Sequence, residues 1–379
     1  MSVTINIGGD FCIEPGYLGK PLLGDDIKAL YKNADINIVN LECPVNEHGD
    51  DHKIIKHGPH LQTTEQIFEY LTQLNITTVT LANNHLLDYG EEAVDATFRA
   101  CHNNGISYVG AGADLQEAAE YIIIEKNDIK IALLNFCEHE WSIATTDTAG
   151  ANPIDIIDNL AAIKKAKAAA DMVLVIIHAG NEYYNLPRPA LKKLFRFFAD
   201  NGADAVVSHH THTISGYETY NNVPIIYGLG NMLFTRKTGY AGWYTGLTAQ
   251  LTVEKNKAVQ FTLVPTKQSK EDFTLSVTAG KEKEEVLQET AALSAVIADD
   301  LKLEQAWNSL IEKRMPQYLY HFSPVPAMPG RYVKSALRRM GFVNTLTPPE
   351  YLTGVINYIT CESHLDMARQ VLKKKLFKK

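Results

Sequence analysis

The chain has 379 residues, of which 45% are hydrophobic, and a formal net charge of −8 at pH 7. This length and hydrophobic content predict a globular protein with two domains, or one large domain with an appendage. The acidic balance and the lack of any nucleic-acid motif argue against nucleic-acid binding, and no run approaches the ~20 apolar residues of a membrane span.

In the first third of the chain, short apolar runs alternate with helical patterns, which is typical of an α/β fold. We expect strands at residues 3–7, 36–41 and 77–81, and helices at residues 25–34 and 67–74. Each of these strands is followed closely by polar side chains, namely Asp10, Glu42, and the pair Asn84 and His85. A polar segment rich in glycine and histidine, residues 46–60, precedes the second helix.

The middle of the chain continues the same alternation. Two apolar runs around a Lys-Asn-Asp turn predict a hairpin of residues 121–124 and 129–136. Helices are expected at 158–170 and 191–199. The first is followed by a continuous apolar strand at 172–177, and the second by a strand at 203–207 that is apolar except for Asp204. The first of these strands ends at His178, and the second is followed by His209, His210 and His212. Further strands are expected at 224–227, 242–253 and 258–264.

The last part of the chain has a different character. Helical patterns occupy residues 284–315, 331–340 and 363–377, with a proline-rich connector at 322–330. Residues 330–379 carry a charge of +7, which leaves −15 for residues 1–329. We therefore expect an α/β domain at 1–265 and a basic, mostly helical appendage at 266–379. Five scattered cysteines without a C-x-x-C pair predict free thiols in a reducing cytoplasm.

Polar groups gather at the ends of five predicted strands. The set is Asp10, Glu42, Asn84, His85, His178, His210 and His212. If the strands lie in adjacent sheets with aligned ends, these groups share one crevice, and they match the mixed oxygen and nitrogen ligands of a dinuclear divalent metal site. On extended backbone, His210 and His212 would point the same way and either converge on one centre or bridge two. A histidine-rich surface turn is the alternative for these histidines taken alone.

A family resemblance becomes visible in the order of the motifs. They are Gly9-Asp10, Asn40-Leu41-Glu42, Ala82-Asn83-Asn84-His85 with Asp88-Tyr89-Gly90, His178-Ala179-Gly180-Asn181-Glu182-Tyr183, Ser208-His209-His210-Thr211-His212, and Tyr227-Gly228-Leu229-Gly230-Asn231. From about residue 4 to residue 265 the chain resembles the bacterial CapA family of capsule and poly-γ-glutamate synthesis, which is related to calcineurin-like metallophosphoesterases. The resemblance implies a four-layer α/β/β/α sandwich with two metals between the sheets.

The resemblance also implies roles for single residues. Asp10 and His212 resemble ligands of a first metal, and Glu42 stands in the place of a bridging carboxylate. Asn84, His178 and His210 resemble ligands of a second metal. His85 resembles a catalytic acid that works beside Asp10 and Glu42. Cys12 replaces a histidine of the wider superfamily, which would weaken the first site. Residues expected near the ligands are Cys12, Glu182, His209 and Asn231.

The function implied is that of a metal-dependent phosphoester hydrolase in the synthesis of capsule or another cell-surface polymer, polysaccharide or poly-γ-glutamate. It would use two divalent ions, Mn, Fe or Zn, to attack an anionic phosphoester. The alternative is a non-catalytic metal-binding accessory that binds an anionic polymer or scaffolds the synthesis complex.

The basic appendage has two possible roles. It either packs its apolar stripe of Leu365, Ala368, Leu372 and Leu376 against the acidic body, which we favour, or it contacts the synthesis complex or an anionic membrane surface. We expect a cytoplasmic protein, in the second case peripheral to the inner face of the membrane. No nucleic-acid partner is expected.

Overall fold

The structure is a computed structural model that describes residues 2–360 and 362–376. It divides into two compact units, Met1–Leu303 and Glu304–Lys379. The first unit continues past residue 265, where we expected the appendage to begin, because β16 and α7 pack on its sheets.

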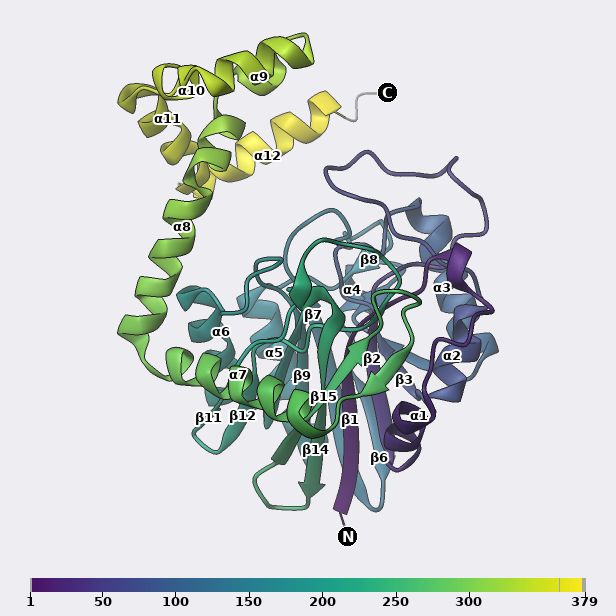
Figure 1. Ribbon diagram of the computed structural model, residues 1–379. Coiled ribbons are helices and arrows are strands. Elements are labelled where there is room, and N and C mark those ends of the chain that lie inside the picture. Colours follow the sequence, from purple (N-terminus) through teal and green to yellow (C-terminus); the bar gives the residue numbers. More distant parts are fainter. Residues whose placement is uncertain (1, 361, 377–379) are drawn as a thin grey trace. The chain divides into compact units, whose positions relative to one another are not determined.

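Two sheets form the centre of the first unit (Figure 1). The eight-stranded sheet has the order β16-β15-β14-β1-β2-β3-β4, with β13 beside β1. Its strands are β1 (Ser2–Cys12), β2 (Ile36–Leu41), β3 (Thr78–Thr80), β4 (Ser107–Val109), β13 (Asn231–Phe234), β14 (Thr245–Glu254), β15 (Gln260–Gln268) and β16 (Leu275–Val277). The six-stranded sheet has the order β11-β12-β10-β9-β7-β6. Its strands are β6 (Ile122–Lys126), β7 (Ile129–Cys137), β9 (Met172–His178), β10 (Ala205–His209), β11 (Tyr217–Tyr220) and β12 (Val223–Ile226).

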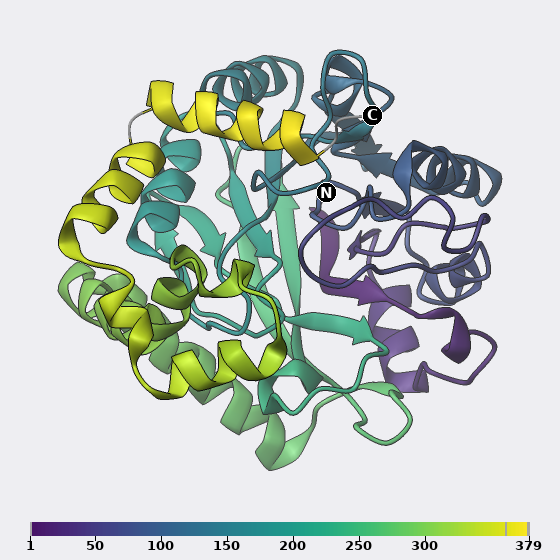
Figure 2. The ribbon, with the colours of Figure 1, turned by 90° about the horizontal axis from the view of Figure 1, so that it is seen from above.

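The helices of the first unit lie outside the two sheets. They are α1 (Asp25–Lys32), α2 (Ile67–Gln73), α3 (Gly90–Asn103), α4 (Leu115–Ala118), α5 (Ile156–Ala169), α6 (Pro189–Asp200) and α7 (Gly280–Ala298). In Figure 2 the blue α2 and α3 and the teal α5 and α6 lie on opposite sides of the strands. A short pair of strands, β5 (Ala111–Gly112) and β8 (Gly150–Ala151), forms a separate ladder.

The alternation of side chains along each strand builds a layer between the sheets. Ile5 and Ile7 of β1 pack in one buried cluster with Leu133 of β7 and Leu174 and Ile176 of β9. The other face of the eight-stranded sheet forms a second cluster with α1, α2 and α3. On the outer face of the six-stranded sheet, α5 contacts β7 and β9, and α6 contacts β10 and β12. The expected four-layer α/β/β/α sandwich is therefore confirmed.

Most predicted elements of the first unit are found with small shifts of their ends. The predicted strand at 36–41 corresponds to β2 (Ile36–Leu41), all six residues of which are buried. The predicted hairpin is β6 and β7, which pair antiparallel through Asn127 and Asp128, both at positive φ, as tight hairpin turns require. Helix α6 begins with Pro189 at its first turn and buries Leu191, Phe195 and Phe198.

The first strand is longer than expected, and this changes the place of Asp10. β1 runs from Ser2 to Cys12, so Asp10 lies inside the strand rather than past its end. The strand continues because it changes partners. Its first half pairs antiparallel with β14, and Asp10 to Cys12 pair parallel with β13, with a register shift between Asp10 and Phe11.

The remaining helices are α8 (Asp300–Phe322), α9 (Arg331–Arg339), α10 (Phe342–Thr345), α11 (Pro349–Thr360) and α12 (Glu362–Leu376). The helical pattern at 284–315 forms two helices instead of one. They separate at Asp299, whose Oδ1 accepts hydrogen bonds from the backbone amides of Leu301 and Lys302 and so caps a new helix.

The second unit leaves part of the apolar stripe of its last helix exposed. Leu372 and Leu376 of α12 are 67% and 48% exposed, and Leu365 and Ala368 are half-buried. The expected packing of this stripe on the acidic body stays a prediction. The expected end of the helix, Phe377, lies outside the described residues. Among the helices of residues 2–360 and 362–376, none is long and apolar enough to cross a membrane. The four cysteines within these ranges are buried and form no disulfide.

Candidate metal centre

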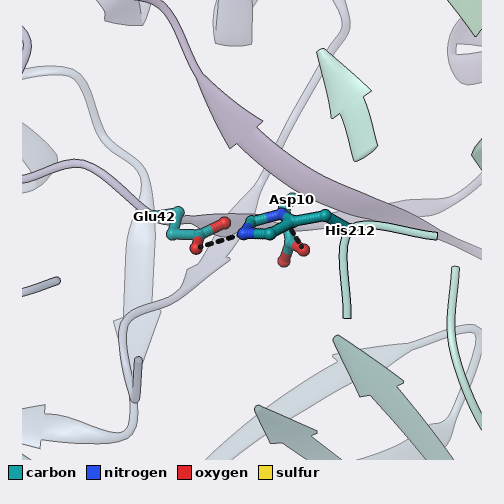
Figure 3. Close-up of side chains that lie close together, drawn as sticks. All are labelled: Asp10, Glu42 and His212. Atoms are coloured by element: carbon teal, nitrogen blue, oxygen red, sulfur yellow. Dashed lines mark ion pairs between the residues drawn. The ribbon is translucent and has the colours of Figure 1, made fainter. Parts of the chain in front are cut away.

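One strand residue and two residues that follow other strands form a buried triad. Asp10 lies in β1, Glu42 directly follows β2, and His212 lies three residues beyond β10. One ligand atom of each lies within 4.8 Å of the others. Figure 3 shows the imidazole of His212 between the two carboxyl groups, with Nδ1 at 3.4 Å from Asp10 Oδ2 and Nε2 at 3.5 Å from Glu42 Oε1.

Glu42 is the least satisfied member of this triad. Its side chain is fully buried, and neither carboxylate oxygen has a hydrogen-bond partner within the described chain. A buried carboxylate without donors is costly unless a cation neutralises it. The orphaned oxygens, a second buried carboxylate and an imidazole together fit a divalent metal ion.

Burial and the close approach of charged groups shift the pKa values of all three triad residues. Burial raises the pKa of Asp10, but the hydrogen bond and charge of His212 and the charge of His178 outweigh it and lower the pKa below its usual range. For Glu42, burial and the neighbouring Asp10 charge raise the pKa well above its usual value. Burial lowers the pKa of His212, yet Glu42 and Asp10 raise it overall to about 10. Without metal, His212 is therefore a cation beside the ionised Asp10, whereas the raised pKa of Glu42 favours its neutral form.

Asn84, His178 and His210 form a second ligand group beside the triad. His178 Nε2 lies 3.0 Å from Asn84 Oδ1 and 3.0 Å from His210 Nδ1. The same Nε2 atom lies 4.0 Å from Glu42 Oε1. The backbone amide of His210 donates to Asp10 Oδ2 at 3.2 Å. Glu42 and Asp10 thus adjoin both groups.

The backbone around the clustered histidines differs from our expectation. β10 ends at His209, and His210 and His212 have φ values of 91° and 53°, so neither is on extended backbone. Non-glycine residues in this left-handed region carry strain of about 1–3 kcal/mol each, which surrounding contacts must offset. The turn directs His212 to the triad and His210 to the second ligand group. His210 and His212 therefore do not converge on one centre. They lie in two adjacent groups, which is the second of the two arrangements that we expected.

His85 stands at the edge of the triad, with Nε2 at 4.0 Å from Glu42 Oε1. Its Nδ1 lies 2.7 Å from Asp88 Oδ2 and 3.2 Å from Lys56 Nζ, and Lys56 also pairs with Asp88. Burial lowers the pKa of His85, although Asp88 opposes the shift. The sequence did not identify Lys56. It lies in the polar segment at 46–60, and nothing in that pattern places it against a strand end 29 residues later in the chain.

Two asparagines hold the ligands in orientation. Asn40 donates from Nδ2 to Asp10 Oδ1 at 2.8 Å and lies 3.3 Å from His178 Nδ1. Asn231, expected near the ligands, contacts His212 Nδ1 through Oδ1 at 2.9 Å and donates to the carbonyl of Trp243. Contacts of this kind fix the ring orientation of a ligating histidine. Asn40 belongs to the quoted motif, but its spacing alone gives no sign of this role.

The other residues expected near the ligands have different surroundings. His209 Nε2 lies 2.8 Å from the carbonyl of Gly8. Burial raises the pKa of the Cys12 thiol well above its usual value, and a hydrogen bond with Cys43 adds to the shift, so the sulfur stays protonated. Glu182 lies near enough to raise the pKa values of both Glu42 and His212.

Glu140 is a further acidic group that the sequence did not identify. Its Oε2 accepts from Asn84 Nδ2 at 3.3 Å, and its Oε1 lies 3.9 Å from His210 Nε2. Glu140 follows β7 by three residues, so a search for polar groups beyond strand ends would have included it.

Comparison with known proteins places these motifs in a family. The sequence profile described as "Bacterial capsule synthesis protein PGA_cap" matches residues 10–236, which include the triad and the second ligand group. A relative from Bacillus subtilis (strain 168), "PGA biosynthesis protein CapA", is 32% identical over 63% of this chain and 63% of its own length. "Capsule biosynthesis protein CapA" from Bacillus anthracis is 31% identical over 56% of this chain and 52% of its own. The chain thus spans less than two thirds of these relatives.

Among solved structures, a 5'-nucleotidase precursor from Thermus thermophilus is 13% identical to this chain. The match covers 77% of this chain and 59% of the nucleotidase chain, with a TM-score of 0.42. A likeness of this size supports no conclusion about fold or function. The profile match over more than half of the chain does identify the family. The chain belongs to the PGA_cap family of bacterial capsule synthesis proteins.

Proposed function

We propose that this protein is a metal-dependent phosphoester hydrolase that acts in the synthesis of capsule or another cell-surface polymer. The observation that carries the proposal is the buried Glu42 carboxylate without hydrogen-bond partners, in contact distance of His212 and beside Asp10. Such an arrangement is costly as it stands and becomes favourable when cations bind. The names of the relatives, CapA proteins of capsule and PGA biosynthesis, support the polymer pathway.

The proposed ligands form two sites that share Glu42. Asp10, Glu42 and His212 would hold a first divalent ion, and Asn84, His178 and His210 a second one. Mn, Fe or Zn suit this mixture of imidazole, amide and carboxylate ligands. When bound, such ions would lower the pKa of a water molecule and neutralise charge on a phosphoryl group.

Side chains of the protein would supply the proton and orient the ligands. His85 is proposed to donate a proton from Nε2 to the leaving oxygen of the ester, because this atom faces Glu42 while Nδ1 is held by Asp88 and Lys56. Asn40 and Asn231 would keep Asp10 and His212 in place. An anionic phosphoester is the proposed substrate class, because the cations and the proton donor meet at this end of the sheets.

An assay with an aryl phosphate tests the hydrolase. Protein supplied with manganese should release phosphate, and a chelated sample should not. A His85→Gln variant should keep its metal content and lose about 10²–10⁴-fold in turnover, the range of general acid catalysis. His102→Gln, an exposed histidine in α3, is the matched control and should leave turnover unchanged. A metal-loaded parent that releases no phosphate from any ester would overturn this function.

The alternative is a non-catalytic accessory that binds an anionic polymer or scaffolds the synthesis complex. The observation that favours it is Cys12, whose protonated, buried thiol supplies no ligand in place of a histidine. A weakly held first ion would leave a crevice that binds anions without cleaving them. A relative from Mycobacterium tuberculosis is named a "probable polyglutamine synthesis accessory protein". Retention of poly-γ-glutamate by a metal-loaded protein without phosphatase activity would favour this function.

We also propose that the second unit contacts an anionic membrane surface or the synthesis complex from the cytoplasmic side. Exposed apolar side chains on α12, Leu372 and Leu376, lie on a part of the chain whose charge is +7. Apolar side chains next to basic ones are typical of helices that lie on anionic surfaces.

A further inference from the structure

Three aromatic side chains from two loops lie beside the triad. Tyr183 comes from the loop between β9 and α6, and Tyr240 and Trp243 come from the segment between β13 and β14. The ring of Tyr183 is stacked on Trp243 with centroids 6.0 Å apart and an angle of 25°, and Tyr240 meets it edge-on at 5.3 Å. His212 of the triad lies 4.7 Å from Trp243 and 6.2 Å from Tyr183. We call Tyr183, Tyr240 and Trp243 the aromatic platform.

The protein holds Tyr183 in place while leaving it open to solvent. Its φ is 61°, a strained value for a tyrosine, and its amide donates to the carbonyl of Thr211 at 2.9 Å. Even so, Tyr183 is 42% exposed, whereas Trp243 beneath it is 1% exposed. A large ring is thus kept at a strained backbone position next to the buried triad and still leaves 42% of the residue exposed. The exposed part of the ring is available to a ligand.

The support of the platform is rigid. The carbonyl of Trp243 accepts hydrogen bonds from Asn231 and Gln268, and the hydroxyl of Tyr240 donates to Thr213 Oγ1. Asn231 also contacts His212, so one side chain links the platform to the triad. The indole Nε1 of Trp243 is buried and has no hydrogen-bond partner within the described residues. The platform is therefore positioned by the same contacts that position a candidate metal ligand.

A positively charged residue lies on the same segment between β13 and β14 as two members of the platform. Arg236 follows β13, the strand that pairs with β1 at Asp10 to Cys12. Arg236 is half-buried as a residue, and its side chain forms no salt bridge or hydrogen bond within residues 2–360 and 362–376. Its charge acts on both Tyr183 and Glu14, and in each case it opposes the rise in pKa that burial causes. An arginine with free donors is suited to bind a phosphate or carboxylate.

We propose that the aromatic platform and Arg236 select the substrate: Tyr183 stacks on a ring in the group esterified to phosphate, and Arg236 binds the phosphoryl oxygens. This inference rests on the proposed function, because it places the phosphoryl group at the metal centre. It assigns the site a preference for ring-bearing phosphoesters over short alkyl esters. Saccharide and nucleoside phosphates share this chemistry, since a pyranose and a nucleobase both present a flat face to an aromatic ring.

Binding of phosphonates, which are not hydrolysed, tests the inference apart from turnover. Calorimetric titration of the manganese-loaded protein should show phenylphosphonate binding about 3- to 10-fold more tightly than methylphosphonate, as one added aromatic contact predicts. Tyr183→Ala should reduce this ratio to about one, while Tyr183→Phe should retain it. Arg236→Ala should weaken both ligands by a similar factor and leave the ratio unchanged. Tyr332→Ala, an exposed tyrosine in α9, is the control.

The outcomes separate the two proposals. Equal binding of the two phosphonates by the parent, or an unchanged ratio in Tyr183→Ala, overturns the inference even if the protein hydrolyses an aryl phosphate. A ring preference that depends on Tyr183 supports the inference even if no ester is hydrolysed, in which case only the hydrolase fails. Phosphonates that carry a pyranose or a nucleoside in place of phenyl then distinguish a sugar from a nucleobase as the preferred ring.

Discussion

His178 and His210 face each other with 3.0 Å between Nε2 and Nδ1, although they lie 32 residues apart. His178 is the last residue of β9, and His210 is the first residue beyond the neighbouring parallel strand β10. Burial lowers the pKa of His178 well below its usual value, and the charge of His210 adds to this shift. The neutral form of His178 that this shift favours leaves a ring nitrogen lone pair, next to the ring of His210, for a cation.

The first prediction concerns metal content. A His178→Ala, His210→Ala double variant should lose most of the bound metal, because two of the three side chains in the second ligand group are removed. Elemental analysis after manganese loading and gel filtration measures this. His102→Ala serves as the control. Metal content equal to that of the parent would show that the second ligand group is assigned wrongly.

A second prediction is that Glu42 contributes to metal binding but not to the stability of the metal-free protein. In Glu42→Gln, the metal-free protein should be at least as stable as the metal-free parent, because a buried carboxylate without donors is replaced by a neutral isostere. Saturating metal should stabilise the parent by about 2–3 kcal/mol at 100 times the dissociation constant, and the variant much less. Thermal unfolding with and without chelator measures both. A large loss of stability in the metal-free variant would contradict this account of Glu42.

The third prediction concerns Cys12. Because its protonated thiol replaces a histidine, the parent should hold one ion more weakly than the other, and Cys12→His should raise occupancy of the first site. The larger ring must enter a fully buried position, so unfolding should become easier by about 1–3 kcal/mol. Metal titration followed by calorimetry measures both affinities, with Cys12→Ser as the control. Two equally tight sites in the parent would refute the idea.

A fourth prediction concerns a pair far from the metal centre. Arg196 donates twice to Glu218, from Nε at 2.9 Å and from a terminal nitrogen at 2.6 Å, and Tyr227 donates at 2.7 Å. Burial raises the pKa of Glu218, but these hydrogen bonds outweigh it and the net shift is downward. Glu218→Gln should therefore cost about 1–2 kcal/mol at pH 7, between the values for surface and buried pairs.

The pH dependence of this cost follows from the sign of the shift. The pKa of Glu218 is lower in the folded protein than in the unfolded chain, where it is near 4.5. The ionised Glu218 therefore stabilises the folded state above pH 4.5, and this stabilisation disappears as the pH falls through the pKa of the folded state. Denaturant unfolding from pH 7 downward should show the parent and Glu218→Gln converging in the acid range. The exposed pair of Glu254 and Lys257 is the control, and Glu254→Gln should leave the stability nearly unchanged at every pH. A constant gap at all pH values would contradict the assignment.

The last prediction concerns the second unit. In the full chain, Leu372→Gln with Leu376→Gln should weaken sedimentation with anionic vesicles by roughly tenfold, because two exposed apolar side chains are removed. Melting temperature should hardly change. Leu301→Gln removes an exposed leucine of the first unit and should leave sedimentation unchanged. Equal sedimentation of the parent with neutral and anionic vesicles, or with none, would refute the membrane contact.

Much of the sandwich could be predicted from the sequence, because buried strands such as β2 and β9 are continuous apolar runs. Polar residues that follow such runs must lie at one edge of parallel sheets, and this rule brought Glu42, Asn84 and His178 together. The rule does not predict the backbone conformation of the residues that follow each strand. It missed the left-handed turn that separates His210 from His212. It also missed Lys56, since a residue from a long polar segment reaches the site through tertiary contacts that no local pattern encodes.

The partner change along β1 determines when the metal centre can exist during synthesis. Ser2 to Ile7 pair with residues 249–254 of β14, and Asp10 pairs with Asn231 of β13. The ribosome must therefore release more than 240 residues after Asp10 before its strand is complete. Until then the N-terminal segment has an unpaired edge, which invites wrong pairing with other chains. If the proposed ligands bind cations, the nascent chain would therefore acquire them late, after translation has passed β14, rather than as each ligand emerges.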